Sequence, residues 1–186
     1  VTFDNYTTTT STAHWEKTAG ASGYLVFRRG YYDAEDAFVQ AADVSTNYAV
    51  LDMVNKSELT YFKVQAYVEI NGVRYYSGLS EAYSTAAVPE KVTIQAQAGT
   101  GEAVLTFTKL QGASFYEIYR AASKDGEYTH IKNYKPEGAP GTEVSYTDRT
   151  AESGATYYYK IRAYKQLEDG TILYGAYGNV EAVTVK

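Results

Sequence analysis

The chain contains an internal repeat, and this feature constrains its fold more than any other. Residues 14–29 read HWEKTAGASGYLVFRR, and residues 106–121, which lie 92 positions later, read TFTKLQGASFYEIYRA. A second matched pair follows at a separation of 97 residues, YFKVQAY at 61–67 and YYKIRAY at 158–164. Two matched segments in the same order predict two tandem domains of one fold, with boundaries at 1–87 and 88–186. Each domain has about 90 residues, which is enough to bury its own core.

Alternation with a period of two predicts β-strands through most of both copies. In the second copy Tyr157, Tyr159 and Ile161 share one face of the run 157–164, and the first copy alternates in the same way. Tight hairpin turns are expected at 71–72 and 169–170, because Asn-Gly and Asp-Gly accept positive φ angles. Only residues 33–44 could hold a turn or two of helix. The fold class is therefore all-β, with each copy a sandwich of short antiparallel strands.

Composition excludes several classes of function. The sequence has no cysteine, so it has no disulfide framework, no thiolate metal site and no cysteine nucleophile. A formal net charge of −5 argues against nucleic acid as a partner. No apolar run approaches the roughly 18 residues of a membrane span. No nucleophile elbow, phosphate loop or dinucleotide fingerprint occurs, so we expect neither an enzyme nor a bound cofactor.

The histidines and the acidic residues give no candidate catalytic or metal site. His14 and His130 belong to different predicted domains, so they cannot form a dyad within one unit. The densest acidic cluster lies in residues 33–43, and it lacks the spacing of a calcium loop. We interpret this cluster as a solvated loop.

The order of these motifs resembles fibronectin type III domains, in particular the tyrosine-rich copies in surface and secreted proteins of Firmicutes. Trp15 matches the tryptophan of that family's second strand, and Phe107 takes its place in the second copy. Tyr157 falls on the family's tyrosine corner, where the resemblance implies a hydroxyl bonded back to the loop that enters the strand. Thr60 stands at the equivalent position of the first copy, so we expect an altered corner there.

The resemblance also implies a function. It indicates two tandem immunoglobulin-like β-sandwiches that act as a non-catalytic spacer or scaffold in a bacterial surface or secreted protein. The expected location is extracellular or associated with the cell wall of a Gram-positive bacterium. The expected partners are neighbouring domains of a larger chain, with a protein or a polysaccharide as a further candidate partner.

Tyrosine is the residue type that could carry binding, because the chain has 21 Tyr against 6 Phe and 1 Trp. One candidate interaction face lies on the outward side of a sheet in the first copy and comprises Leu25, Phe27, Tyr61 and Tyr67. A carbohydrate-binding or host-adhesion module is the alternative, with glycan stacking on Tyr31, Tyr32, Tyr75 and Tyr76. In a third interpretation these aromatic side chains only stabilise the sheets, at about 0.2–1 kcal/mol for each cross-strand pair.

Overall fold

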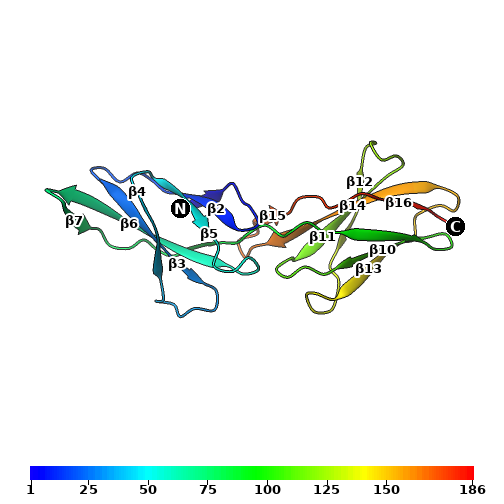
Figure 1. Cartoon of the computed structure of the whole chain (residues 1–186), viewed down its shortest axis with the longest axis horizontal. Helices are drawn as coiled ribbons and strands as arrows, with labels where there is room; N and C mark the ends of the chain where they lie inside the picture. The colour runs from blue at the N-terminus through cyan, green and yellow to red at the C-terminus, as the bar shows by residue number, and fades with distance from the viewer. The chain divides into compact units, whose positions relative to one another are not determined.

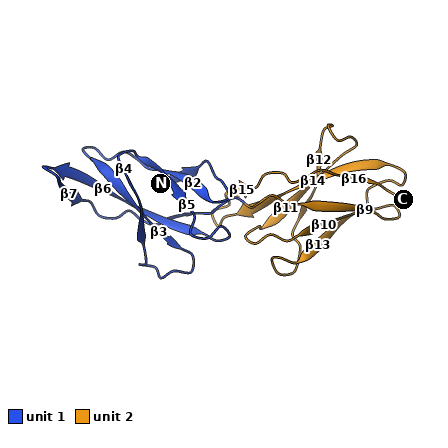
Figure 2. Ribbon diagram, viewed as in Figure 1, with its two compact units in different colours: residues 1–88 blue, residues 89–186 orange.

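The computed structural model describes all 186 residues, which form sixteen β-strands and no helix. The strands divide between two compact units, Val1–Val88 and Pro89–Lys186 (Figure 2). The observed division falls one residue after the boundary expected from the sequence. Residues 33–44, the one stretch that could have held a turn of helix, form turns and an edge strand. None of the elements is a helix long and apolar enough to cross a membrane.

The first unit is a sandwich of two antiparallel sheets (Figure 1). One sheet has the order β1-β2-β5, and the other has the order β4-β3-β6-β7, with β8 also paired to β6. The strands of this unit are β1 (Thr2–Asp4), β2 (Thr10–His14), β3 (Gly23–Gly30), β4 (Val39–Val44), β5 (Tyr48–Asp52), β6 (Thr60–Ile70), β7 (Val73–Tyr76) and β8 (Tyr83–Thr85).

The second unit repeats this topology. Its sheets have the orders β9-β10-β13 and β12-β11-β14-β15, with β16 also paired to β14. The strands are β9 (Ile94–Ala98), β10 (Ala103–Thr108), β11 (Phe115–Ala121), β12 (Thr129–Tyr134), β13 (Glu143–Asp148), β14 (Thr156–Gln166), β15 (Ile172–Tyr174) and β16 (Glu181–Thr184). Both units carry a β-bulge at the same place, between Val26 and Phe27 and between Ile118 and Tyr119.

Each unit buries its own core between its two sheets, and the alternation of the strands supplies the core residues. Val26 and Phe62 are core residues of the first unit, and Ile118 and Tyr159 hold the equivalent positions in the second. Val68 continues the inward face of β6, but it is 36% exposed. The reason is length: β6 has 11 residues, whereas β2 and β5 in the opposite sheet have 5 each.

The predicted structural aromatic residues also lie in the cores. The Trp15 ring meets Tyr24 edge to face at 5.4 Å, and the Phe107 ring lies 4.8 Å from Tyr116. Both tyrosine hydroxyls accept a backbone N–H from the loop before β3 or β11, at 2.8 Å from Thr18 and at 2.6 Å from Leu110. The repeat therefore preserves an aromatic pair together with its hydrogen bond.

The two predicted hairpin turns form, with different geometry. Asn71 and Gly72 both have positive φ angles, 51° and 77°, as a two-residue turn requires. Of the turn residues Asp169 and Gly170, only Gly170 has a positive φ, 87°, and the Leu167 carbonyl closes this turn by accepting the Gly170 N–H at 3.0 Å. The first hairpin therefore has a tighter tip than the second.

Candidate functional site

The predicted interaction face lies on the outward side of β3 and β6, but half of it is covered. Leu25 is 7% exposed and Tyr67 is 8% exposed, so neither offers much area to a partner. The Arg74 guanidinium lies 4.1 Å from the centre of the Tyr67 ring, and the Tyr67 hydroxyl donates to Asp43 at 3.0 Å. Burial, followed by the hydrogen bond to Asp43, raises the pKa of Tyr67 and keeps this hydroxyl protonated.

Phe27 and Tyr61, the other half of that face, are half-buried. The Arg29 guanidinium lies 4.1 Å from the centre of the Tyr61 ring, and the Lys63 ammonium lies 4.9 Å from the centre of Phe38. Each such contact is worth about 0.5–1 kcal/mol at an exposed site. The face that the sequence suggests is apolar is therefore a layer of aromatic rings and cationic side chains in mutual cation–π contact.

The equivalent face of the second unit is more densely cross-linked. Arg162 lies 3.9 Å from the centre of Tyr174 and 4.9 Å from that of Tyr177, and its Nε donates to Glu117 at 2.7 Å. Tyr119 also donates to Glu117, at 2.9 Å. Burial, with hydrogen bonding to Tyr177 and Glu117, raises the pKa of Tyr119 far above its ordinary value. These side chains satisfy one another, as the stabilising interpretation of the tyrosines requires.

The four tyrosines proposed for glycan stacking are all exposed, and Tyr32 is 77% exposed. They do not form one platform. Tyr31 and Tyr32 follow the Gly30 end of β3, whereas Tyr75 and Tyr76 lie on β7, near the Gly23 end. The length of β3 separates the two pairs by about 20 Å. The rings of Tyr31 and Tyr32 also meet at 90°, so they do not share a flat surface.

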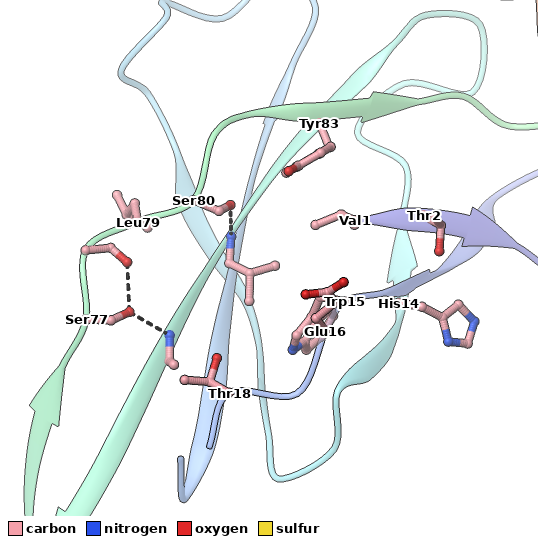
Figure 3. A pocket seen from close by; sticks show the side chains of 13 residues that line it. Val1, Thr2, His14, Trp15, Glu16, Thr18, Ser77, Leu79, Ser80 and Tyr83 are labelled. Carbon is pink, nitrogen blue, oxygen red and sulfur yellow. Dashed lines mark hydrogen bonds between the residues drawn. The ribbon is translucent and has the colours of Figure 1, made fainter. Parts of the chain in front are cut away.

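The first unit has a groove of about 660 Å³ that was not predicted from the sequence (Figure 3). It lies between the end of the β1-β2 sheet and the segment that joins β7 to β8. Its lining consists of Val1, Thr2, His14, Trp15, Glu16, Thr18, Val64, Ala66, Ser77, Gly78, Leu79, Ser80 and Tyr83.

The groove has an apolar floor and one unsatisfied polar atom. Trp15 is 9% exposed, and its indole Nε1 is buried without a hydrogen-bond partner. The serines across the groove are satisfied: Ser77 Oγ accepts the Ala66 N–H at 3.0 Å, and Ser80 Oγ accepts the Val64 N–H at 2.9 Å (Figure 3). Among the side chains that line the groove, the indole is therefore a buried donor without a partner, and a buried N–H without an acceptor costs about 1–3 kcal/mol.

In the second unit, the segment ahead of β9 lies at the equivalent place, and two of the positions that contact it differ between the units. The Asn179 side chain bridges to β9, accepting the Ile94 N–H at 2.8 Å and donating to the Ile94 carbonyl at 3.0 Å. Beside it, a Cβ on Gly178 would lie 1.7 Å from the carbonyl oxygen of Val92. The first unit has Ser80 and Glu81 at these two positions. A serine excludes the close backbone approach, and a carboxylate cannot donate to a carbonyl.

These equivalences follow from the strand pairing. Ser80 donates its N–H to the Val64 carbonyl as Gly178 does to that of Ile161, and Val64 and Ile161 match in the repeat. Aligning residues 77–82, SGLSEA, with residues 175–180, GAYGNV, is the signal that could have indicated the groove from the sequence.

The histidines and the acidic cluster have structural partners. His14 Nε2 lies 2.9 Å from Asp4, and His130 Nε2 lies 3.0 Å from Asn133. In the acidic cluster, Asp33 accepts the Gly30 N–H at 2.7 Å, while Asp43 pairs with Arg74. No group of three or more His, Cys, Asp or Glu side chains is arranged to hold a metal ion.

The sequence matches no family model and no curated protein. Among solved structures, a segment of two fibronectin type III domains from chicken tenascin aligns with a TM-score of 0.52 at 12% identity, over 98% of this chain and 94% of that one. The chain has the tandem fibronectin type III fold. At this identity the likeness shows the fold alone.

Two further structures align less well. The chicken interferon gamma receptor alpha chain matches with a TM-score of 0.46 at 10% identity, over 99% of this chain and 95% of that one. The FN1-FN3 domains of chicken CNTN1 match with a TM-score of 0.43 at 14% identity, over 99% of this chain and 64% of that one.

The tyrosine-corner position carries a hydroxyl-bearing side chain in both units. In the second unit, the Tyr157 hydroxyl accepts the Glu152 N–H at 3.4 Å. In the first unit, the Thr60 hydroxyl accepts the Val54 N–H at 3.0 Å. Both residues therefore satisfy a backbone donor in the loop that enters the strand, and the buried threonine does so with a much shorter side chain.

Proposed function

We propose that this pair of fibronectin type III units is a non-catalytic spacer and scaffold module of a larger surface or secreted protein. The observation that carries the proposal is that the charged and ionisable side chains of the second unit pair with one another within the unit. Asp148, Arg120 and Tyr159 hold one another inside the second unit, and Glu117 and Arg162 hold one another on its outer face. These charged and hydroxyl side chains stabilise the fold, as expected of a module that supplies length and rigidity.

The location that we propose is outside the cell or in the wall of a Gram-positive bacterium. The tyrosine-rich composition and the absence of cysteine are compatible with this setting, because exported proteins of Gram-positive bacteria often do without disulfides. Neighbouring domains of the same larger chain would be the first partners of the module.

A swap experiment tests the spacer function. In the parent protein, residues 1–186 are deleted, and in a second variant they are replaced by the tenascin two-domain segment. Antibody access to an epitope on the domain that the module carries is then measured on intact cells. A spacer predicts that deletion reduces access and that the unrelated tandem restores it. Access that stays low with the tenascin segment would contradict the proposal, because this chain would then act through specific contacts.

Carbohydrate binding remains the alternative function, and the separation of the two tyrosine pairs weighs against a shared platform. A polysaccharide pull-down with intact protein and with a Tyr32→Ala, Tyr75→Ala double variant distinguishes the two functions. Retention of the intact protein that the double variant loses would favour glycan binding, whereas retention of the intact protein at background would favour the spacer.

A further inference from the structure

The three-stranded sheet of the first unit ends in a strand with an open edge. In the order β1-β2-β5, the strand β5 has a neighbour on one side only. Just ahead of β5, the Trp15 N–H donates to the Asn47 carbonyl at 3.0 Å, and the pairing with β2 continues from there without a break. Because antiparallel bonding alternates, Tyr48, Val50 and Asp52 direct their main-chain groups away from β2, toward the open edge.

The centre of this edge is unbonded. The Tyr48 carbonyl accepts the Thr46 hydroxyl at 2.7 Å, and the Asp52 carbonyl accepts a hydrogen bond from Arg28 at 2.6 Å. Val50 lies between them, and its outward N–H and carbonyl have no strand beside them. Its side chain is 66% exposed. A strand edge of this kind is a template for another strand.

The first unit lacks the residues that normally protect such an edge. Its two edge strands on this side, β4 and β5, read VQAADV and YAVLD, without lysine, arginine or proline. In the second unit, β12 contains Lys132, and Thr147 takes the place of Val50. The two positions correspond because Thr147 pairs with Val104 as Val50 pairs with Thr12. Since lysine and other charges on edge strands discourage pairing, only the first unit has an unprotected edge.

Of the two edge strands, β5 is the one suited to pairing. The register of β3 with β4 shifts between Val26 and Phe27, where Ala41 is the extra residue on β4. A bulge bends the edge strand and turns it away from a flat partner. The pairing of β2 with β5 is regular over the whole of β5. A second strand can therefore align along β5 but not along β4.

We propose that β5 of the first unit pairs with β5 of a second copy of this chain, antiparallel and centred on Val50. A two-fold axis places the same strand on both sides of the interface, so the spacing of the main-chain groups matches by symmetry. Val50 exchanges both of its main-chain hydrogen bonds with Val50 of the second copy. The sheet β1-β2-β5 then continues into the same sheet of the second copy.

Charge and bonding favour this register over the neighbouring ones. With Val50 at the centre, Tyr48 lies opposite Asp52 of the second copy, and all three outward residues of β5 are paired. Centring on Asp52 would oppose two carboxylates, which is destabilising. Centring between Val50 and Asp52 would leave Tyr48 unpaired. The pairing is independent of spacing, so it can fail while the spacer function holds.

Sedimentation velocity of the 186-residue protein, from about 10 μM to about 1 mM, tests for the dimer. We expect a reversible monomer–dimer equilibrium with a dissociation constant on the order of 100 μM. It is weak because one pair of five-residue strands buries less than a standard interface and because each copy carries a net charge of −5.

Substitutions at Val50 locate the interface. Val50→Lys places two ammonium groups opposite each other and should weaken the dimer at least about 10-fold. Val50→Pro removes the outward N–H without breaking a bond to β2 and should act in the same direction. The matched controls Thr147→Lys and Thr147→Pro, on the equivalent edge of the second unit, should leave the dissociation constant unchanged.

The register has tests of its own. Tyr48→Lys places an ammonium opposite Asp52 of the second copy and should tighten the dimer about 3-fold, whereas Tyr48→Asp should weaken it by a similar factor. Since the chain has no cysteine, Val50→Cys introduces a single thiol. Opposed residues of a hydrogen-bonded pair have Cα atoms about 5.5 Å apart, within the range of a disulfide. Oxidation should therefore link Val50→Cys into a dimer faster than Thr147→Cys.

Urea denaturation followed by Trp15 fluorescence identifies the variants that fold, and Val50→Lys decides the matter if the proline variant does not. A protein that stays monomeric at about 1 mM would overturn the proposal. So would a dimer that Val50→Lys leaves intact, or one that the Thr147 controls weaken equally. Assemblies that grow beyond the dimer would overturn it too, because two-fold pairing of one edge is closed.

Discussion

At the scale of single residues, the two copies solve the same structural problem with different chemistry. In the second unit, Arg120 donates to the buried carboxylate of Asp148 at 2.9 Å, and Tyr159 donates to the same carboxylate at 2.9 Å. In the first unit, the equivalent Arg28 donates to the main-chain carbonyl of Asp52 at 2.6 Å. Only the second unit therefore depends on a buried charge, although both copies use arginine at this position.

Asp148→Asn should destabilise the second unit by about 3 kcal/mol, because it leaves Arg120 without its charged partner. Hydrogen exchange of the β14 amides measures this loss. The matched control is Asp52→Asn in the first unit, where the side chain is exposed. That control should change stability by less than about 0.5 kcal/mol, and equal effects of the two substitutions would contradict the assignment.

The same carboxylate predicts a pH dependence. Burial by itself raises the pKa of Asp148, but hydrogen bonds from Thr150 and Tyr159 and the charge of Arg120 hold that pKa below its ordinary value of 3.8. The stabilisation is therefore complete above the unfolded pKa and is lost as the pH falls through the lower, folded pKa. Denaturation of the second unit between pH 6 and pH 2 should show this loss, at about pH 4 and below. The Asp148→Asn variant should lack this component of the acid sensitivity.

Thr60→Val should destabilise the first unit by about 1–2 kcal/mol, because it keeps the shape of the side chain and removes the acceptor of the Val54 N–H. Urea denaturation followed by Trp15 fluorescence reports on this unit alone. Thr60→Ser keeps the hydroxyl and should retain most of the hydrogen-bond contribution. If valine were tolerated as well as serine, the threonine would not replace the tyrosine corner.

At the scale of elements, the sequence predicts the strands better than it predicts what closes the sandwich. Alternation and turn chemistry indicate β6 and β14 and their hairpins, because side-chain periodicity and positive φ angles are local properties. The closure at Asn179 and Gly178 depends on contacts with Ile94 and Val92, about 85 positions away in the chain, and no local pattern reveals such a contact. The covered face at Tyr67 was missed for the same reason, because Arg74 reaches it from a neighbouring strand.

Gly178→Ser should open the second unit at the closing edge, because its Cβ would collide with the Val92 carbonyl. We expect a loss of about 1–3 kcal/mol, typical of an overpacked site, together with faster hydrogen exchange at the Ile94 amide. Gly78→Ser in the first unit is the control, since no atom lies within 4 Å of a Cβ at that position. A Gly178→Ser variant as stable as this control would rule out the closing role of the glycine.

At the scale of the whole molecule, exposed apolar side chains are distributed unequally. Thirteen of the fifteen large exposed apolar residues belong to the first unit, among them Ile70, Val73 and Leu79. The duplication predicted one fold twice, and the structure has that fold twice, but the surfaces differ because surface positions are free to diverge once the core is satisfied.

The double variant Ile70→Lys, Val73→Lys should therefore reduce binding of a hydrophobic dye to the protein measurably, and it should change stability by less than about 0.5 kcal/mol. Dye fluorescence and urea denaturation measure the two effects. The single variant Ile172→Lys, at one of the two exposed apolar positions of the second unit, should leave dye binding nearly unchanged. An equal drop for both variants would mean that the dye does not distinguish the units.

The buried position of Val92 has a consequence for how such modules are inherited. A domain defined by its first strand would begin at Ile94, and a recombination event at that point would transfer a sandwich without part of its interior. A break before Pro89 would transfer the same strands with Val92 included. Selection for domains that fold should therefore favour recombination boundaries ahead of Pro89. The inherited unit is then longer than the unit defined by the strands.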